Sequence, residues 1–477
     1  MKKILFVTSE AHPLIKTGGL ADVSGSLPKA LAELSQDVRL IMPNYQAIKP
    51  HGDVRFLCSL RVDNREVNIL ETQMPDNQVT VWLVDYPDFF NRPGNPYLDE
   101  QGEPWPDNAD RFALFCRIAV EVAMNRAYLD WQPDIVHCND WQSGLVPAFL
   151  SLETTKPASV FTIHNMAYQG LFPAASIQGL NLPGQLWNPG GLEFHNMLSF
   201  IKGGLIYANH ITTVSPTYAL EIQTPTFGYG LEGLLEYRKD YLSGIINGID
   251  IDLWNPEADP LIAQQYRAAS LPDKKLNKAE LQRRLSLPVN NRVPLFALIG
   301  RLVEQKGIDL ILDCLPEMMA MPMQFVLLGS GDKDFEQRLQ NLAQVYPDKM
   351  AITLGYDETL AHLIEAGSDV FLMPSRFEPC GLNQMYSQRY GTLPIVRKTG
   401  GLADTVVDSL PETISDRTAT GFVFNEANAS SLLETIKRAM ILYSDQKTWT
   451  KIQANAMAKD FSWQSSAEQY LTLYRSL

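Results

Sequence analysis

The sequence predicts an α/β fold built from two Rossmann-like domains, each with a parallel sheet. In the first half of the chain, short apolar segments typical of buried strands alternate with helical patterns, and they span residues 3–9, 37–43, 133–140, 159–165 and 208–215. A second series spans residues 294–301, 324–331, 369–375 and 393–401. Strands that alternate with helices favour a parallel, doubly wound sheet. Because the pattern restarts in the second half, we expect two such sheets with a cleft between them.

Length and composition indicate where the domains divide. A chain of 477 residues is long enough for two or three domains of roughly 100–200 residues each. Residues 246–260 are rich in Gly, Pro, Asn and Asp and lie between the two series, so we interpret them as a linker. Residues 1–245 then form the first domain and residues 261–457 the second. In such sheets, ligands bind beyond the carboxyl ends of the strands.

Charge and cysteine content narrow the class of protein. The formal net charge of -14 disfavours binding to nucleic acid and to anionic membrane surfaces. The five cysteines form no CxxC pair, and their odd number and wide spacing fit a reduced cytosol better than a disulfide framework or a zinc site. The apolar run at residues 4–7 is too short for a signal peptide, and no stretch approaches the ~18 apolar residues of a membrane span. We therefore expect a cytoplasmic protein with no nucleic-acid or membrane partner.

One heptapeptide, KTGGLAD, occurs twice, at Lys16–Asp22 and at Lys398–Asp404. Each copy follows a predicted strand and opens a predicted helix. Both copies are compatible with a glycine turn that caps the helix. They are also compatible with backbone N–H groups, at Gly18 and Gly19 in the first copy, that face an anion or a sugar hydroxyl at the positive end of the helix. The motif is neither a Walker A loop nor GxGxxG, and both interpretations stay open.

Charged side chains follow two predicted strands of the second domain. In GRLVEQKG, Arg301 and Lys306 come directly after a strand, where they can straddle a diphosphate or simply be solvated surface charges. The position at a strand end favours the diphosphate. In SRFEPCGLNQ, Glu378 lies in a turn stiffened by Pro379, and Gly381 can open a helix towards phosphate. A carboxylate held rigidly there can accept hydrogen bonds from sugar hydroxyls, although a lone Glu in a loop is more often a solvated charge.

Polar residues also end two neighbouring strands of the first domain. His137, Asn139 and Asp140 end one strand, and His164 and Asn165 end the next. Because the carboxyl ends of parallel strands meet at one edge of a sheet, we expect these groups to line the same crevice. A single histidine is more often structural, but polar ends on successive strands favour a site.

Two DxD matches raise the question of a metal-bound diphosphate. DID at residues 250–252 lies in the linker, and DKD at residues 332–334 carries a lysine between its acids. Such short matches are common by chance, and Arg301 with Lys306 can neutralise a diphosphate without a metal. The chain has no HExxH motif and no Cys–His cluster. We therefore expect no metal.

With these motifs, the chain resembles the bacterial glycogen synthases and plant starch synthases of glycosyltransferase family 5. The resemblance runs over essentially the whole length and includes KTGGLADV (16–23), HCNDW (137–141), FTIHNMAYQG (161–170), TVSPTYA (213–219), INGID (246–250), GRLVEQKG (300–307), SRFEPCGLNQ (375–384), RKTGGLADTV (397–406) and FSW (461–463). Among retaining glycosyltransferases, KTGGL with its lysine is specific for this family. Because no plastid transit segment precedes the first strand, we expect the bacterial branch.

The resemblance implies a GT-B fold, in which the parallel sheets of two Rossmann-like domains face each other across a deep cleft. It implies that residues 1–245 form the acceptor side, that residues 261–457 bind the nucleotide sugar, and that residues 458–477 form a helix crossing back to the first domain. The implied reaction transfers glucose, with retention, from ADP-glucose to the non-reducing 4-OH of an α-1,4-glucan such as glycogen or a maltooligosaccharide. It uses no cofactor and no metal ion.

The resemblance also assigns catalytic roles to residues of this sequence. The implied catalytic set is Lys16, Asp140, His164, Arg301, Lys306 and Glu378. In that set, Glu378 holds the glucose hydroxyls and His164 lies beside the anomeric centre. Arg301 and Lys306 neutralise the diphosphate, and Asp140 is a polar cleft residue near the sugar.

Further residues are implied to bind the substrate. Those outside the catalytic set are Gly18, Gly19, Asn247, Tyr356, Gly381, Leu382 and Asn383. The first two present their amides, together with Lys16, to the phosphates and glucose of the donor. Asn247 lies near the sugar, Tyr356 stacks on the nucleotide base, and the last three residues start a helix under the phosphates.

One position departs from the wider superfamily, in which many retaining GT-B enzymes carry Glu-x7-Glu with the second acid on the ribose. This chain has Tyr386 eight residues after Glu378, as family 5 usually does, so ribose binding stays unassigned.

No carboxylate is clearly placed as a covalent nucleophile, and we favour front-face attack through an oxocarbenium-like state. Two alternatives stay open: another retaining GT-B glucosyltransferase with a small acceptor, and a catalytically inactive glucan-binding protein.

Overall fold

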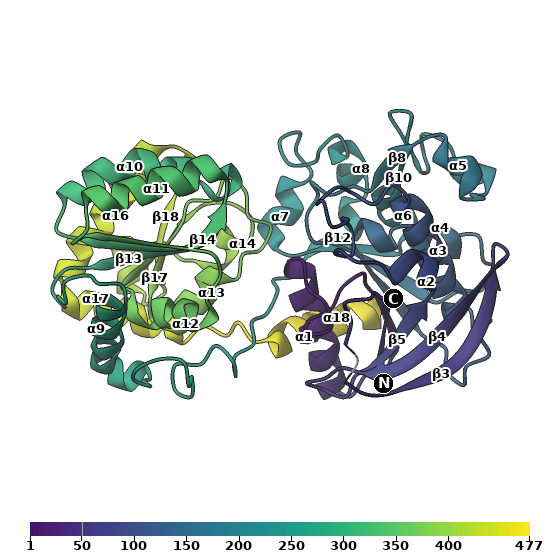
Figure 1. The fold of residues 1–477 in the computed structure, drawn as a ribbon, viewed down its shortest axis with the longest axis horizontal. Helices are drawn as coiled ribbons and strands as arrows, with labels where there is room; N and C mark the ends of the chain where they lie inside the picture. The colour runs from purple at the N-terminus through teal and green to yellow at the C-terminus, as the bar shows by residue number, and fades with distance from the viewer. Residues whose placement is uncertain (50) are drawn as a thin grey trace. The chain divides into compact units, whose positions relative to one another are not determined.

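The computed structural model describes residues 1–49 and 51–477, which divide into two compact units. Unit 1 comprises Met1–Gly248 and Trp463–Leu477, and unit 2 comprises Ile249–Ser462. The chain therefore passes from one unit to the other at Gly248–Ile249 and returns at Ser462–Trp463. Figure 1 shows the ribbon of both units.

Unit 1 is built on a sheet of nine strands among the described residues, in the order β12-β11-β7-β6-β1-β2-β5-β4-β3 (Figure 1). The strands are β1 (Lys3–Val7), β2 (Asp37–Pro43), β3 (His51–Val62), β4 (Arg65–Gln73), β5 (Thr80–Asp85), β6 (Ile135–Asn139), β7 (Ala158–Ile163), β11 (His210–Thr213) and β12 (Leu242–Gly244). Neighbours from β12 to β5 run parallel. Ile4, Leu5, Phe6 and Val7 of β1 are all fully buried, as expected of a central strand covered on both faces. The predicted alternation of strands and helices is confirmed.

Our prediction of parallel strands omits the hairpin of β3 and β4, which runs antiparallel and extends the sheet beyond β5. Its two-residue turn is Asp63–Asn64, with φ of 48° and 62°. Both residues lie in the left-handed region that a two-residue hairpin turn requires, and Asp and Asn tolerate it better than most residues. The hairpin needs no crossover helix, so a search for strand–helix alternation passes over it.

The helices of unit 1 include one from the end of the chain. They are α1 (Gly19–Glu33), α2 (Pro87–Phe90), α3 (Asn108–Ala123), α4 (Leu145–Leu150), α5 (Ser176–Gly179), α6 (Phe200–Tyr207), α7 (Pro216–Glu221), α8 (Glu232–Tyr237) and α18 (Trp463–Ser476). α18 packs beside α1 (Figure 1). The hydroxyl of Tyr474 in α18 lies 2.6 Å from Nδ1 of His137, and Nε2 of His137 lies 2.6 Å from Oγ1 of Thr162. His137 is fully buried, so it ties α18 to the sheet and does not line a crevice as we expected.

Unit 2 is built on a fully parallel sheet of six strands within the described ranges, in the order β15-β14-β13-β16-β17-β18 (Figure 1). The strands are β13 (Leu295–Leu302), β14 (Gln324–Gly331), β15 (Met350–Leu354), β16 (Val370–Met373), β17 (Leu393–Arg397) and β18 (Phe422–Phe424). The helices are α9 (Lys274–Arg284), α10 (Ile308–Ala320), α11 (Lys333–Val345), α12 (Glu358–Gly367), α13 (Asn383–Arg389), α14 (Gly400–Thr405), α15 (Pro411–Ser415), α16 (Ala429–Ser444) and α17 (Gln446–Met457).

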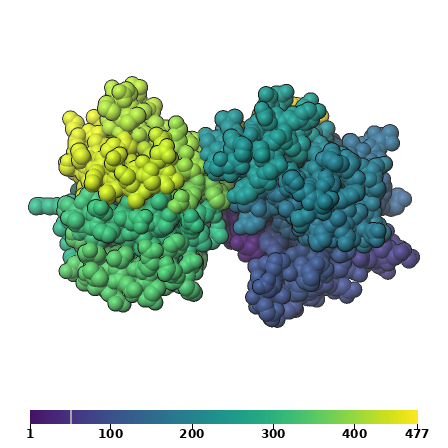
Figure 2. Space-filling view, turned by 90° about the horizontal axis from the view of Figure 1, so that it is seen from above, coloured from purple at the N-terminus to yellow at the C-terminus, as the bar shows by residue number. Residues whose placement is uncertain are grey.

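Helices cover both faces of the unit 2 sheet, and the strands alternate between two cores. Phe296 and Leu298 of β13 pack in a core with α10, α11, α16 and α17. Leu295 and Ala297 of the same strand pack in a core with α9 and α12. This alternation follows from the two-residue period of a strand. Figure 2 shows residues of α16 and α17, coloured yellow-green to yellow, gathered on the surface of unit 2.

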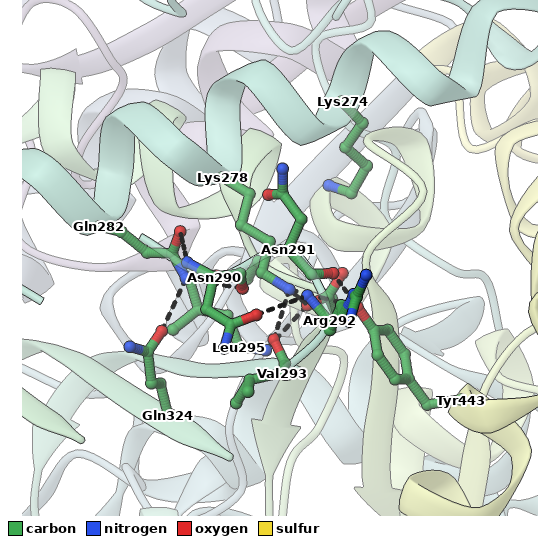
Figure 3. Close-up of polar contacts among 12 residues, drawn as sticks. Lys274, Lys278, Gln282, Asn290, Asn291, Arg292, Val293, Leu295, Gln324 and Tyr443 are labelled. Atoms are coloured by element: carbon green, nitrogen blue, oxygen red, sulfur yellow. Dashed lines mark hydrogen bonds and ion pairs between the residues drawn. The ribbon is translucent and has the colours of Figure 1, made fainter. Parts of the chain in front are cut away.

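A buried lysine from α9 joins the amino ends of two strands of this sheet. Nζ of Lys278 donates to the carbonyl oxygen of Val293 at 2.6 Å (Figure 3). It also donates to Oδ2 of Asp369 at 2.6 Å. The same oxygen of Asp369 accepts the N–H of Leu295 at 2.8 Å. The Lys278 side chain is 2% exposed, so removing either partner would leave an uncompensated buried charge. This pair is structural and lies at the strand ends opposite the candidate site.

Within the ranges that the structure covers, no helix has the length and apolar character needed to cross a lipid bilayer.

Candidate functional site

The candidate site residues of unit 2 lie at the carboxyl ends of its strands. Arg301 lies near the end of β13 and is exposed, and Lys306 lies in the 3₁₀ helix η5 (Glu304–Lys306) that follows. Glu378 lies in the turn after β16. Its Oε2 is 2.5 Å from Nζ of Lys306 and accepts the hydroxyl of Ser375 at 3.1 Å. The side chain of Glu378 is only 9% exposed, so the ion pair holds a nearly buried carboxylate in place.

A glycine allows the loop of Lys306 to approach the turn of Glu378. Gly307 follows Lys306 and has a φ of 70°, in the left-handed region. A Cβ atom at this position would lie 2.2 Å from the carbonyl oxygen of Pro374, just after β16. Only glycine permits both the conformation and the contact. The lysine and the carboxylate are therefore brought together by backbone packing between two strand ends.

The second copy of KTGGLAD supports the turn of Glu378. Gly400 has a φ of 42°, and a Cβ atom there would lie 2.0 Å from the carbonyl oxygen of Glu378. A Cβ atom on Gly401 would lie 2.2 Å from the carbonyl oxygen of Cys380. The N–H of Gly401 also donates to the carbonyls of Glu378 and Pro379, at 3.2 and 3.1 Å. These glycines are required by packing, which is the structural interpretation of the repeat.

The first copy of KTGGLAD differs in what surrounds its glycines. A Cβ atom built on Gly18 or Gly19 meets no described atom within 4 Å. Packing within unit 1 therefore does not demand glycine at either position, and the open space favours close approach of a ligand to the backbone. Lys16 is 48% exposed, and its Nζ lies 2.6 Å from Oδ1 of Asp22. The second copy therefore fits the interpretation as a glycine turn required by packing. The open space at the first copy favours the interpretation as a ligand-binding loop.

The residues predicted to lie under the phosphates begin α13. Gly381 has a φ of 76°, which favours glycine. The side-chain amide of Asn383 donates to the carbonyl oxygen of Ile299 at 2.9 Å and fixes the start of α13 against β13. Leu382 precedes the helix, and among the described residues no side chain caps its first amides. The N-terminal amides of a helix are suited to an anionic group.

Two tyrosines near the predicted nucleotide position differ in their surroundings. Tyr356 follows β15 and is 80% exposed. Tyr386, at the position that binds ribose in the wider superfamily, stacks on Trp254 with ring centroids 4.0 Å apart. Trp254 also stacks on His362 at 3.9 Å. Tyr386 is therefore packed against the segment that follows Gly248–Ile249, and the ribose stays without an assigned ligand.

Asp140 combines backbone strain with a perturbed pKa. It follows β6 with a φ of 53° and a ψ of −178°, a region that non-glycine residues rarely adopt. Such strain costs about 1–3 kcal/mol and is concentrated at functional sites. Oδ1 of Asp140 accepts the N–H of His164 at 2.8 Å. Burial raises the pKa of Asp140 to about 7, and the charge of Glu10 adds to this shift.

His164 and Asn247 complete the candidate set of unit 1. Nε2 of His164 lies 3.0 Å from Oδ1 of Asn139. Burial lowers the pKa of His164, so its imidazole is neutral at neutral pH. Asn247 is 8% exposed, and its Oδ1 finds no hydrogen-bond partner among the described residues. A buried amide oxygen without a protein partner is a natural acceptor for a ligand hydroxyl.

The predicted residues form two sets, one in each unit. Unit 1 holds Lys16, Gly18, Gly19, Asp140, His164 and Asn247. Unit 2 holds Arg301, Lys306, Tyr356, Glu378, Gly381, Leu382 and Asn383. The loops after β1, β6 and β7 are neighbours because those three strands are adjacent and parallel. Each set follows the carboxyl ends of strands, where ligands bind in sheets of this kind.

Both DxD matches have local structural roles. Oδ1 of Asp250 accepts the N–H groups of Asp252 and Leu253 and closes a turn. Oδ1 of Asp332 accepts the N–H of Asp334 and caps α11. Across residues 1–49 and 51–477, no cluster of three or more His, Cys, Asp or Glu side chains is arranged to hold a metal ion.

Three further residues, Glu10, Tyr97 and Ser375, lie near these sets and were not predicted from the sequence. Glu10 and Ser375 each lie just after a strand, so the rule that selected Asp140 could have selected them too. Tyr97 lies between β5 and α3, far from any predicted motif, and no sequence signal identifies it.

Two domains with parallel sheets, each carrying polar side chains at its strand ends, define a two-domain GT-B glycosyltransferase. A family model described as the starch synthase catalytic domain matches residues 3–237, and one described as glycosyl transferases group 1 matches residues 281–456. The chain belongs to the family of glycogen and starch synthases, which confirms the resemblance and the predicted fold class.

Individual relatives match over the whole chain. Glycogen synthase 1 of Methylococcus capsulatus is 54% identical over 473 residues, which cover 99% of this chain and 96% of that protein. Glycogen synthase 2 of Nitrosococcus oceani is 51% identical over 480 residues, which cover 100% and 98%. The catalytic domain of starch synthase IV from Arabidopsis thaliana, solved bound to ADP and acarbose, is 35% identical with a TM-score of 0.88 and covers 100% and 99%.

Proposed function

We propose that this protein catalyses the glycogen synthase reaction, the retaining transfer of glucose from ADP-glucose to the non-reducing 4-OH of an α-1,4-glucan. The observation that carries the proposal is the identity of 54% and 51%, over nearly the full length, to two proteins named glycogen synthase. The starch synthase relative was solved with ADP and acarbose, which supports an adenine nucleotide and a glucan as substrates. Glycogen or a maltooligosaccharide is the proposed acceptor.

The donor's diphosphate would be held by Arg301 and Lys306. An ammonium group has three donors, so Lys306 can keep its bond to Glu378 and still bind a phosphate oxygen. As the glycosidic bond breaks, negative charge builds on the leaving phosphate. Cations already in place then stabilise the transition state more than the bound substrate. Glu378 would use its other oxygen, Oε1, to accept hydroxyls of the transferred glucose.

The groups of unit 1 would position the donor sugar and the acceptor. His164 is neutral, so it can lie beside the anomeric centre without opposing the positive charge that develops there. Lys16 would exchange its partly exposed partner Asp22 for the donor, because exposed ion pairs contribute little. Asp140 and Asn247 would accept hydroxyls near the sugar.

Retention of configuration would follow from front-face attack. We assign no covalent nucleophile, and catalysis would rest on positioning the acceptor hydroxyl and on stabilising the departing diphosphate. Tyr356 would stack on the base. The amides of Gly18 and Gly19 would face the donor, and the start of α13 at Gly381, Leu382 and Asn383 would lie under the phosphates.

We also propose that the two domains bind different substrates. Residues 1–245 would bind the acceptor and residues 261–457 the nucleotide sugar, with residues 246–260 as the linker. Residues 458–477 would return to the first domain, which is supported by the place of α18 in unit 1. We propose a cytoplasmic location, no nucleic-acid or membrane partner, and no metal requirement, since Arg301 and Lys306 supply the positive charge.

One comparison of donors and acceptors tests the proposal. The purified protein is incubated with glycogen and either ADP-glucose or UDP-glucose, and nucleotide release is measured. We expect release of ADP that depends on glycogen. Release only with a small sugar or sugar phosphate would favour a transferase with a small acceptor, and glycogen binding without release from either donor would favour an inactive binding protein.

A further inference from the structure

Glu10 is a buried carboxylate that lies beside the loop of the first KTGGLAD copy. It follows β1 and is 3% exposed. Its Oε2 accepts the N–H of Thr17 at 2.5 Å and the hydroxyl of Thr17 at 2.8 Å. Its Oε1 accepts the hydroxyl of Tyr97 at 3.1 Å. Each of these groups is a donor, and an ionised carboxylate can only accept, so the site is built for the charged form.

The contacts of Glu10 fall at Thr17, between the base of the loop and the two glycines. The loop base is tied by the N–H of His12 to the carbonyl of Ala21 at 3.0 Å. Beyond Thr17, Gly18 and Gly19 have open space around the position of a side chain. The N–H of Gly18 also lies close enough to Glu10 to lower the pKa of that carboxyl. The carboxylate therefore holds the backbone that leads into the two glycines.

Glu10 also acts on Asp140 through its charge. Burial raises the pKa of Glu10, and the bonds from Thr17 and Tyr97 lower it in part. The negative charge of Glu10 raises the pKa of Asp140, in addition to the larger effect of burial. The backbone N–H groups of His164 and Asn165 oppose this shift. The other titratable groups that interact with the two carboxylates are Tyr45, Tyr97 and Tyr218.

We propose that Glu10 is a positioning residue of the transferase site, which holds Thr17 and Gly18 so that Lys16 and the amide of Gly19 face the donor. The proposal rests on the proposed function for the identity of the donor. The hold on the loop is a property of the ligand-free protein and can be measured without turnover.

Two substitutions separate the hold on the loop from the charge. Glu10→Ala removes both, whereas Glu10→Gln keeps an acceptor for Thr17 and removes the charge. We measure hydrogen exchange of the amides from Thr17 to Leu20 in both variants. Glu71→Gln is the matched control, because Glu71 of β4 accepts the indole N–H of Trp82 of β5, away from the loop.

In Glu10→Ala, loss of hydrogen bonds to a charged group should speed exchange of these amides by about tenfold or more. In Glu10→Gln, exchange of the same amides should rise by a smaller factor, because the neutral amide oxygen still accepts from Thr17 but binds it less strongly than a carboxylate. In active enzyme, Glu10→Ala should also raise KM for ADP-glucose more than KM for glucan. Glu71→Gln should change none of these readouts.

Unchanged exchange in folded Glu10→Ala would overturn the hold on the loop. Should the alanine variant fail to fold, Glu10→Gln decides the question, because exchange as slow as in the unchanged protein would overturn a hold that depends on the carboxylate charge. If exchange changes as expected but ADP-glucose is not a donor, the proposed function fails and the positioning role of Glu10 stands.

Discussion

Lys306 and Glu378 are 72 residues apart in the sequence, and Nζ of Lys306 lies 2.5 Å from Oε2 of Glu378. The loops that carry them leave adjacent strands, β13 and β16, at the same edge of the sheet. Gly307 and Gly400 each bring backbone within a distance that no side chain would allow. The pair therefore places the cation proposed for the diphosphate directly beside the carboxylate proposed for the sugar.

The first prediction concerns Glu378. Glu378→Ala should lower kcat at least about 10–100-fold, because hydrogen bonds to a charged group contribute about 1.5–3 kcal/mol each. Affinity for ADP should stay near normal, since ADP carries no glucose for the carboxylate to hold. Initial rates and calorimetric titration with ADP measure the two effects. Lost ADP affinity with a normal kcat would contradict the role given to Glu378.

The second prediction concerns the two cations. Arg301→Ala and Lys306→Ala should each lower kcat by about ten- to a few-hundred-fold and raise KM less, because they act on charge that develops in the transition state. The double variant should be less than additive, since both cations act on one group. Arg283→Ala is the control, because Arg283 is 60% exposed on α9 and pairs with Glu280. Near-normal kcat in a folded single variant would refute the role of that residue.

Much of this site could be predicted from the sequence because it follows strand ends. Arg301, Asp140 and His164 lie at the ends of strands, as expected, and Glu378 lies in the turn that follows β16. Their partners could not be predicted, because contact between two loops depends on strand order. The sequence does not reveal that β13 lies between β14 and β16, so it does not reveal that Lys306 meets Glu378.

The third prediction is a pH dependence set by Asp140. Burial and the charge of Glu10 raise the pKa of Asp140 to about 7, so the carboxyl is largely protonated below that pH and ionised above it. The ionised form accepts sugar hydroxyls better, so kcat/KM should rise as pH increases through about 7. Asp140→Asn should lower activity about 10–100-fold and remove this limb of the profile. A profile that keeps the limb in Asp140→Asn would assign the titration to another group.

The two copies of KTGGLAD show where identical sequence cannot predict role. In the second copy, Gly400 and Gly401 are required by contact with the turn of Glu378. In the first copy, Gly18 and Gly19 have open space, and Glu10 fixes the backbone instead. The difference lies in what surrounds each loop, and seven identical residues carry no information about that.

The fourth prediction is that activity survives removal of divalent metal. In the proposed reaction Arg301 and Lys306 would supply the positive charge for the diphosphate, and the acids of both DxD matches hold local turns or caps. Rates in excess EDTA should therefore match rates in added Mg²⁺ or Mn²⁺. A strict dependence on either ion would show that the two cations do not suffice.

The most direct test of the proposed reaction follows growth of a defined glucan. The protein is incubated with maltoheptaose and ADP-glucose, ADP release is counted, and the new glycosidic bonds are identified by NMR. The account predicts one ADP per glucose added, and each addition as an α-1,4 bond at the non-reducing end. ADP release without chain growth, or a bond of β configuration or another position, would contradict it.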